Sequence, residues 1–151
     1  MWSKAPLNER HIGAVIAIEK ASFKNPWPRA SFISELACRE AMDYVATDPQ
    51  SKQIIAYVCL RRNINEMHLL KIAVAPQWRR YGVATWLLNS CFRLAIKEGM
   101  ETVHLEVRPT NRAARAFYQK LGFQIIGTRP KYYTDTGEEA LVLIKDLKEA
   151  P

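Results

Sequence analysis

The chain has 151 residues, of which 48% are hydrophobic and 25% charged, values typical of a globular protein rather than a disordered one. At this length one hydrophobic core suffices without disulfides or metals, so we expect a single domain spanning residues 1–151. The 22 Lys and Arg residues outnumber the 15 Asp and Glu residues and give a formal net charge of +7. This excess favours an anionic partner and argues against a polycationic substrate such as a polyamine.

The three cysteines, Cys38, Cys59 and Cys91, are odd in number and widely spaced, so we expect neither a disulfide framework nor a zinc site built from them. The N-terminal residues lack the apolar stretch of a signal peptide. No apolar run approaches the roughly 20 residues that cross a bilayer. We therefore expect a cytoplasmic protein with no membrane partner.

Hydrophobic periodicity predicts two helices at the start of the chain. Apolar residues recur at helical spacing over residues 7–23, and the two prolines of residues 25–28 end that pattern. A second helix is expected to follow immediately and to turn Phe32, Leu36 and Ile33 inward.

Three strands and the clearest helix come next. Apolar, β-branched runs predict strands at residues 44–47, 54–60 and 67–74. Between Gly82 and Gly99 an apolar stripe with helical spacing predicts a long helix, with Gly99 as its left-handed C-terminal cap. The stripe comprises Ala84, Leu87, Leu88, Cys91, Phe92 and Ala95.

The last third of the chain mixes strands with one more helix. Residues 102–107 alternate and predict a strand with one apolar face, whereas His104 and Glu106 point to the other face. The other expected elements are a helix capped by Thr110 or Asn111 and ended at Gly122, and closing strands at residues 123–127 and 140–144. This order predicts an α+β fold in which one mixed sheet is flanked by helices on both faces.

Residues 74–84 join a predicted strand to the long helix and contain no carboxylate. Gly82 and Ala84 are small enough for the backbone to approach a ligand closely, and the free N–H groups of the first helical turn favour an anion. Arg79 and Arg80 add two positive charges, so the segment suits a diphosphate. It matches neither the Walker A nor the Rossmann pattern. An ordinary strand–helix turn with solvated arginines is the other interpretation.

The rest of the chain resembles the GNAT superfamily of N-acetyltransferases, which transfer acetyl from acetyl-CoA to amines. The resemblance runs from about Leu7 to Leu147. Arg79-x-x-Gly82-x-Ala84 resembles the superfamily's pyrophosphate loop, with Arg79 where glutamine is common and Ala84 where a second glycine is common. The downstream signature is similar to Leu105-Glu106-Val107, Asn111, Ala116-Phe117-Tyr118 and Leu121-Gly122-Phe123. The N-terminus looks short for the superfamily's first strand, which we expect to be brief or absent.

Within the superfamily the chain is most similar to the bacterial ribosomal-protein alanine N-acetyltransferases. That family's usual target is the N-terminal alanine of the eighteenth protein of the small ribosomal subunit. The resemblance therefore implies a GNAT-type sheet, and a protein N-terminus as the acceptor of the acetyl group. The segments that carry it are Ile18-Glu19, Pro26-Trp27, Ile72-Ala73-Val74, Leu105-Glu106-Val107-Arg108, Tyr132-Tyr133 and Gly137-Glu138.

The resemblance also implies catalytic roles for two residues. It places a general base that acts through water at Glu106 and a general acid for the leaving thiolate at Tyr118. A single carboxylate can suffice as base, because an α-amino group titrates near pH 8 and roughly a tenth of it is neutral at pH 7. The alternative for Glu106 is a solvated strand carboxylate paired with Arg108 or a neighbour, and the alternative for Tyr118 is a core tyrosine on an apolar helical stripe.

Coenzyme contacts are implied along the strand and the loop, and no metal is expected. The backbone of the strand would pair with the pantetheine arm, and Asn111 would hydrogen-bond the same arm as well as cap its helix. The implied coenzyme residues are Ile72, Ala73, Val74, Arg79, Arg80, Tyr81, Gly82, Val83, Ala84, Thr85 and Asn111.

The acceptor peptide is expected to meet Trp27, Tyr132 and Tyr133. Trp27 is equally consistent with a hydrophobic contact between the first two helices, and one of the two tyrosines with a solvent-facing position. Acetylation of a small-molecule amine is the alternative function. Direct nucleic-acid recognition is disfavoured, because the basic residues are not interleaved with aromatic ones and no RNA-binding signature is present.

Overall fold

The computed structural model describes residues 1–148 and contains one seven-stranded mixed sheet in the order β1-β2-β3-β4-β5-β7-β6. The strands are β1 (Ser3–Pro6), β2 (Tyr44–Thr47), β3 (Ile54–Asn63), β4 (Glu66–Val74), β5 (Thr102–Val107), β6 (Gln124–Arg129) and β7 (Ala140–Asp146). The helices are α1 (Ile12–Ser22), α2 (Arg29–Ala37), α3 (Val83–Lys97) and α4 (Arg112–Lys120), with short 3-10 turns at Glu9–His11 and Pro76–Trp78. The α+β prediction is confirmed.

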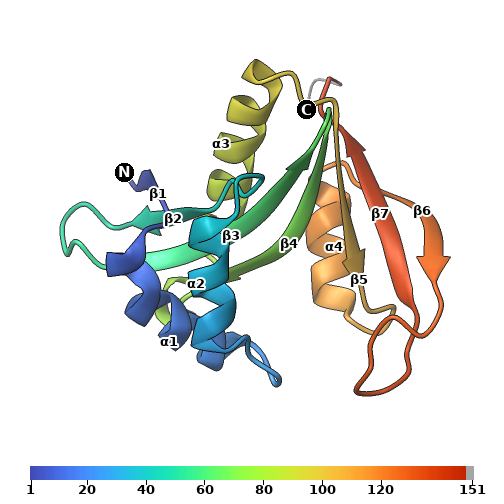
Figure 1. Ribbon diagram of the computed structural model, residues 1–151, viewed down its shortest axis with the longest axis horizontal. Coiled ribbons are helices and arrows are strands. Elements are labelled where there is room, and N and C mark those ends of the chain that lie inside the picture. The colour runs from blue at the N-terminus through green and yellow to red at the C-terminus, as the bar shows by residue number, and fades with distance from the viewer. Residues whose placement is uncertain (149–151) are drawn as a thin grey trace.

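Helices cover both faces of the sheet (Figure 1). Neighbouring strand residues alternate between two cores, as the two-residue period of a strand requires. On β3, Val58 belongs to the core that contains side chains of α3 and α4, whereas Tyr57 belongs to the core that contains side chains of α1 and α2. On β5, the apolar residues face α3 and α4, so the opposite face of β5 presents His104 and Glu106. The two-sided arrangement expected from the sequence is therefore present.

The centre of the sheet is splayed between β4 and β5. These strands are the sheet's parallel pair, and within residues 1–148 their register consists of Glu66 with Thr102, Met67 with Val103, and His68 with His104. Beyond that last pair the strands diverge (Figure 1). The second half of β4 therefore keeps backbone groups free on the side that faces β5.

The N-terminal strand is brief, as expected, with four residues that pair antiparallel with β2. The helix predicted over residues 7–23 begins later, at Ile12. Asn8 caps a 3-10 turn before it: its side chain accepts from the backbone of Arg10, and His11 accepts from the Asn8 backbone. The chain needs this turn to pass from the sheet edge into α1.

The inward orientation predicted for Ile33 and Leu36 is wrong. Phe32 is fully buried on α2, but Ile33 and Leu36 are 42% and 38% exposed. The buried position one turn after Phe32 belongs to Glu35, whose carboxylate pairs with Arg61 of β3. A buried carboxylate with a partly exposed arginine partner thus occupies the place that apolar periodicity assigned to leucine.

Both glycines that frame the long helix have left-handed backbones, with φ of 83° at Gly82 and 87° at Gly99. Gly99 ends α3 as predicted, because the amide of Met100 donates back to the carbonyl of Ala95. Among residues 1–148 no helix is long and apolar enough to cross a membrane.

Candidate active site

The divergence of β4 and β5 opens a cleft of about 920 Å³, which we call the central cleft. It is bounded by the second half of β4, the end of β5, the starts of α3 and α4, and two connections, α1–α2 and β6–β7. Of the residues predicted to act, those that line it are Ile72, Ala73, Val74, Arg79, Ala84, Glu106, Asn111, Tyr118 and Tyr133. Segments far apart in sequence therefore meet in one cavity.

The loop before α3 has the backbone of an anion-binding turn. Arg80 has a φ of 70° and Gly82 a φ of 83°, and the helix begins at Val83. The first-turn amides have no acceptor within the helix, so they are free to donate to a ligand. The rest of the predicted loop lies here beside the cleft, at Arg80, Tyr81, Gly82, Val83 and Thr85.

Arg79 is partly engaged within the protein. Its Nε donates to the carbonyl of Val74 at 3.0 Å, and its Nη2 donates to the hydroxyl of Ser22 at 3.0 Å. These bonds tie the loop to the end of β4 and to the end of α1. Arg79 therefore fixes the loop as well as contributing charge to the cleft.

Glu106 is the carboxylate of the central cleft that is best positioned to accept a proton. Its side chain is 4% exposed, and its Oε1 accepts from His68 Nε2 at 2.6 Å and from the Tyr132 hydroxyl at 3.3 Å. Burial raises the pKa of Glu106, but the hydrogen bond and positive potential of His68, followed by Arg129, outweigh burial and leave this pKa lowered. Glu106 is therefore ionised at neutral pH and able to accept a proton.

Of the two kinds of partner that the sequence left open for Glu106, Arg108 or another neighbour, the structure shows the second, His68, and not Arg108. Arg108 instead holds the β6–β7 connection. Its Nη2 contacts both carboxylate oxygens of Asp135 at 2.9 Å, and its Nη1 lies 3.2 Å from Glu138. Its guanidinium lies 3.9 Å from the ring centre of Tyr133.

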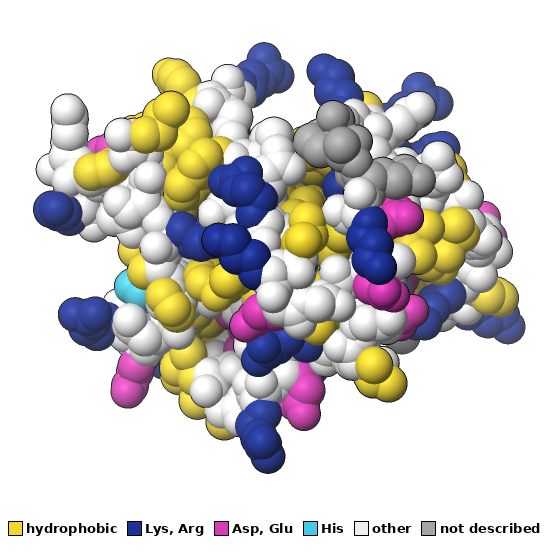
Figure 2. All heavy atoms as spheres, turned by 90° about the horizontal axis from the view of Figure 1, so that it is seen from above, with side chains coloured by type: hydrophobic (Ala, Val, Ile, Leu, Met, Phe, Trp, Pro, Cys, Tyr) yellow, Lys and Arg dark blue, Asp and Glu magenta, His cyan; other side chains and the backbone are white. Residues whose placement is uncertain are grey.

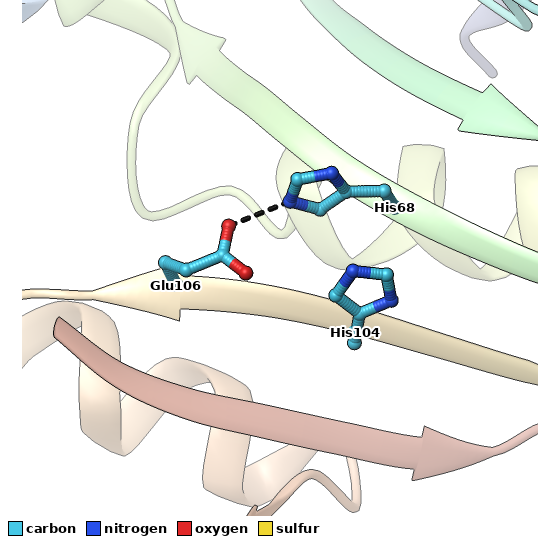
Figure 3. A group of neighbouring side chains, drawn as sticks. All are labelled: His68, His104 and Glu106. Atoms are coloured by element: carbon cyan, nitrogen blue, oxygen red, sulfur yellow. Dashed lines mark hydrogen bonds and ion pairs between the residues drawn. The ribbon is translucent and has the colours of Figure 1, made fainter. Parts of the chain in front are cut away.

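Two histidines that sequence reasoning did not single out flank Glu106 (Figure 3). The ring of His68 stacks on that of His104, with 4.3 Å between centroids. Burial, and then the neighbouring His68, lower the pKa of His104. The alternation of β5 already placed His104 beside Glu106, but His68 reaches this site through the parallel register of β4 and β5, which no local pattern encodes.

Tyr118 both packs and faces the cleft. Its ring contacts those of Phe117 and Phe123, with centroids 5.1 and 5.4 Å away. Burial, and then the nearby Tyr133, raise the pKa of Tyr118 to about 12, so the phenol keeps its proton at neutral pH. The core interpretation and the catalytic interpretation of this residue are thus compatible.

Asn111 caps α4 as predicted: its Oδ1 accepts from the amide of Ala114 at 3.2 Å while the residue lines the central cleft. The cap fixes the start of α4 and therefore the position of Tyr118 two turns later. One side-chain oxygen thus supports a helix at the edge of the cavity.

Trp27 lies beside the cleft and packs against the α1–α2 core. Its ring is 5.4 Å from that of Phe32, and Lys71 Nζ lies 4.6 Å from its ring centre. Its backbone N–H donates to the buried carboxylate of Glu19 at 2.8 Å, and Tyr57 and Lys71 donate to the same carboxylate. The hydrophobic contact proposed for Trp27 is therefore present.

The α1–α2 and β6–β7 connections, which both border the central cleft, touch each other. Asn25 Nδ2 donates to Asp135 at 3.2 Å, which links the α1–α2 connection to the β6–β7 connection. Tyr132 and Tyr133 pack edge to face within the second connection, with centroids 5.0 Å apart. Together these contacts form a bridge over one mouth of the central cleft.

Comparisons with known proteins define the class. The acetyltransferase (GNAT) family matches residues 12–123, and the chain belongs to this family, whose members use acetyl-CoA. It is 32% identical over 139 residues to the ribosomal protein bS18-alanine N-acetyltransferase of Escherichia coli strain K12, covering 91% of this chain and 92% of that one. The chain is an N-acetyltransferase.

Two further comparisons agree with this assignment to the N-acetyltransferases. An N-alpha-acetyltransferase of Sulfurisphaera tokodaii is 31% identical over 150 residues, covering 90% of this chain and 87% of that one. The crystal structure of the ribosomal-protein-S18-alanine N-acetyltransferase from Escherichia coli superposes with a TM-score of 0.88 at 29% identity, covering 100% of this chain and 97% of that one.

The basic excess is not gathered into one continuous patch on the face shown in Figure 2. Lys and Arg side chains lie there as separate groups, with acidic and hydrophobic side chains between them. On this face the charge is therefore dispersed, which differs from the continuous basic stripe of a nucleic-acid interface.

Proposed function

We propose that this enzyme acetylates the N-terminal amine, with alanine as the first residue, of a protein of the small ribosomal subunit. Similarity to alanine N-acetyltransferases over nine tenths of the chain supports this choice of acceptor. The observation that carries the chemistry is the central cleft itself, where an ionised carboxylate and a protonated phenol line one cavity at the point of strand divergence. We propose that residues 1–151 act as one domain in the cytoplasm, where ribosomes are found.

The donor would enter between the splayed strands. Along Ile72, Ala73 and Val74, the backbone groups that face away from β3 can pair with the amides of a pantetheine arm as an added strand would. The first-turn amides of α3 and the two arginines before it suit the diphosphate, and Asn111 offers its side chain to the arm. Acetyl-CoA supplies an activated thioester, and the residues named here orient it.

The acceptor amine would lie next to Glu106. A new N–C bond forms to the acetyl carbon as the C–S bond breaks, so one proton leaves the nitrogen and one must reach the sulfur. We propose that Glu106 receives the first proton through a water molecule and that Tyr118 donates to the leaving thiolate. No metal takes part in this sequence.

The acceptor peptide would be held by the bridge over the cleft. Tyr132 and Tyr133 face Glu106 from the β6–β7 connection. Trp27 packs within the α1–α2 connection and supports it. A chain terminus can enter under such a bridge more easily than an internal lysine, whose backbone continues in both directions. We propose no direct contact of this site with nucleic acid.

A panel of acceptors tests the proposal. The enzyme is incubated with acetyl-CoA and either a peptide that begins with alanine, the same peptide with its terminal amine blocked and an internal lysine, a polyamine, or an aminoglycoside. We expect thiol release with the first peptide alone. Release with the aminoglycoside or the polyamine instead would favour the small-molecule alternative, and release with the blocked peptide would contradict terminal specificity.

A further inference from the structure

Three side chains of kinds that ligate metals lie together where β4 and β5 begin to diverge. His68 and His104 occupy the last paired register of β4 and β5, and Glu106 follows His104 by two residues on the same face of its strand (Figure 3). One donor atom of each residue lies within 4.8 Å of the other two. The strand register therefore brings together two imidazoles and a carboxylate that are separated by up to 38 positions in sequence.

One of the two carboxylate oxygens of Glu106 has no hydrogen-bond partner in the described part of the chain. Oε1 of Glu106 accepts from His68 and Tyr132, but Oε2 is buried and has no hydrogen-bond partner among residues 1–148. A buried carboxylate oxygen without a partner is costly. A cation bound at Oε2 would remove that cost.

The donor set selects a class of ion. Two imidazole nitrogens with one carboxylate oxygen suit zinc and its transition-metal neighbours, whereas magnesium and calcium prefer oxygen donors alone. Zinc bonds of about 2.0–2.2 Å in a tetrahedral site place donors about 3.3 Å apart. The donor atoms, which lie within 4.8 Å of one another, would have to close by up to about 1.5 Å to reach this spacing. His68, which is 27% exposed, gives the ion a route from solvent.

We propose that His68, His104 and Glu106 form a binding site for a zinc-like transition-metal ion, and that occupation of this site inhibits the enzyme. Three protein donors leave at least one position open for water or another ligand. The binding site stands on the geometry alone. Its inhibitory effect rests on the proposed function, because an ion held by Glu106 would take the lone pair that accepts the substrate proton. This site would contain no cysteine, and it differs from the expectation of no metal given in the sequence analysis.

Direct binding is the first test. Protein stripped with a chelator is titrated with Zn²⁺ in the absence of coenzyme, whose thiol would compete, and binding is followed by competition with a chromophoric chelator. We expect one ion per chain, bound at micromolar concentration or tighter. His104→Gln and His68→Gln should each weaken binding by about tenfold or more. His11 is the one remaining histidine of the chain and lies outside the cluster, so His11→Gln should leave zinc binding unchanged.

Several results would overturn the site. They are the absence of binding tighter than about 100 µM, a stoichiometric ion whose affinity is the same in His104→Gln, and equally tight binding of Mg²⁺. Circular dichroism checks the fold of each variant. If His68→Gln does not fold, His104→Gln alone decides, because the contact between His68 and Glu106 does not depend on His104.

Inhibition is tested separately, at buffered free zinc, by the amount of acetylated peptide formed. The rate of each protein with zinc is compared with its own rate without metal, and zinc should inhibit the wild type but lose most of that effect on His104→Gln. Equal inhibition of both proteins would contradict the regulatory claim. If zinc binds as described but no amine is acetylated, the proposed function fails while the metal site stands.

Discussion

At the scale of single residues, Tyr118 is the sharpest test of the proposed mechanism. Replacing it with Phe keeps the ring that packs against Phe117 and Phe123 and removes only the hydroxyl that the mechanism uses. We therefore expect Tyr118→Phe to lower kcat by about 10²-fold and to leave the melting temperature nearly unchanged. Steady-state acetylation of an alanine-initiated peptide and thermal unfolding measure the two quantities.

Tyr44→Phe is the matched control, because it removes the same atom from a tyrosine on β2, outside the central cleft. Its rate should equal that of the wild type. A Tyr118→Phe enzyme that works within about twofold of the wild type would remove the hydroxyl from the mechanism.

Individual site residues differ in how far the sequence could predict them. Glu106, Tyr118 and Asn111 belong to short motifs that resemble the family signature, and each lines the central cleft. His68 belongs to no such motif, because its place beside Glu106 follows from a parallel pairing across 36 residues. Trp27 had two interpretations in the sequence: its contacts with Phe32 and Lys71 show that it packs, and its contact with the acceptor peptide stays a prediction.

At the scale of elements, Arg108 connects β5 to the β6–β7 connection. Its two-oxygen contact with Asp135, its contact with Glu138 and its position over Tyr133 together hold that connection above the cleft. We expect Arg108→Gln to raise the KM for the peptide by roughly two- to fivefold while the KM for acetyl-CoA changes little, because the neutral side chain loses the contacts that hold this connection in place.

Initial-rate measurements with each substrate varied in turn separate the two constants. Arg62→Gln serves as the control: it removes an exposed pair with Glu98 away from the site and should change neither KM. If Arg108→Gln raised both constants equally, the arginine would support the whole cleft rather than its acceptor side.

A second feature at the scale of elements is a pair of buried carboxyl groups that links α2 to the start of β2. Asp43 and Glu35 are buried, and neither Asp43 Oδ2 nor Glu35 Oε1 has a donor among the described residues, so one proton shared between them would serve both. Burial, and then the hydrogen bond and charge of Glu35, raise the pKa of Asp43 to about 8 from an ordinary value of 3.8.

The sign of the pH effect follows from that shift. Between about pH 4 and pH 8 the folded chain holds a proton on Asp43 that the unfolded chain has released. The free energy of unfolding therefore loses up to about 1.4 kcal/mol per pH unit from this group as pH rises, and the loss stops above pH 8. Asp43→Asn does not titrate, so its stability relative to the wild type should rise across this range.

Urea unfolding at several pH values between 5 and 9 measures the difference. Asp48→Asn is the control, because Asp48 lies in an exposed turn and its pKa is lowered by hydrogen bonds from Ser51, which puts its titration below this range. Parallel stability curves for the wild type and Asp43→Asn would show that Asp43 is ionised in the folded chain.

The same region shows why element orientation was only partly predictable. Periodicity located α2 correctly and identified Phe32 as buried, but it assigned the next inward position to Leu36. The fold places Glu35 there and offsets its burial with Arg61, a partner 26 residues away on β3. Sequence patterns rank residues by polarity, so they miss a polar residue whose partner lies on another element.

At the scale of the whole molecule, the two halves of the sheet meet at three residue pairs of β4 and β5, and the central cleft lies where they part. A coenzyme bound there would contact both halves. By mass action, acetyl-CoA at 100 times its Kd should add about 2.7 kcal/mol to the free energy of unfolding. For a chain of this size we expect a rise in melting temperature of about 5–10 °C.

Hydrogen exchange locates the source of that shift. Protection should increase at the amides of Ile72, Ala73 and Val74 and in the first turn of α3, because both segments would donate to the bound coenzyme or lie beneath it. The β1–β2 pair at the far edge of the sheet is the internal control and should slow only as much as the global stability requires. A thermal shift without protection on either side of the cleft would mean that the coenzyme binds elsewhere, and the splay of β4 and β5 would then need another explanation.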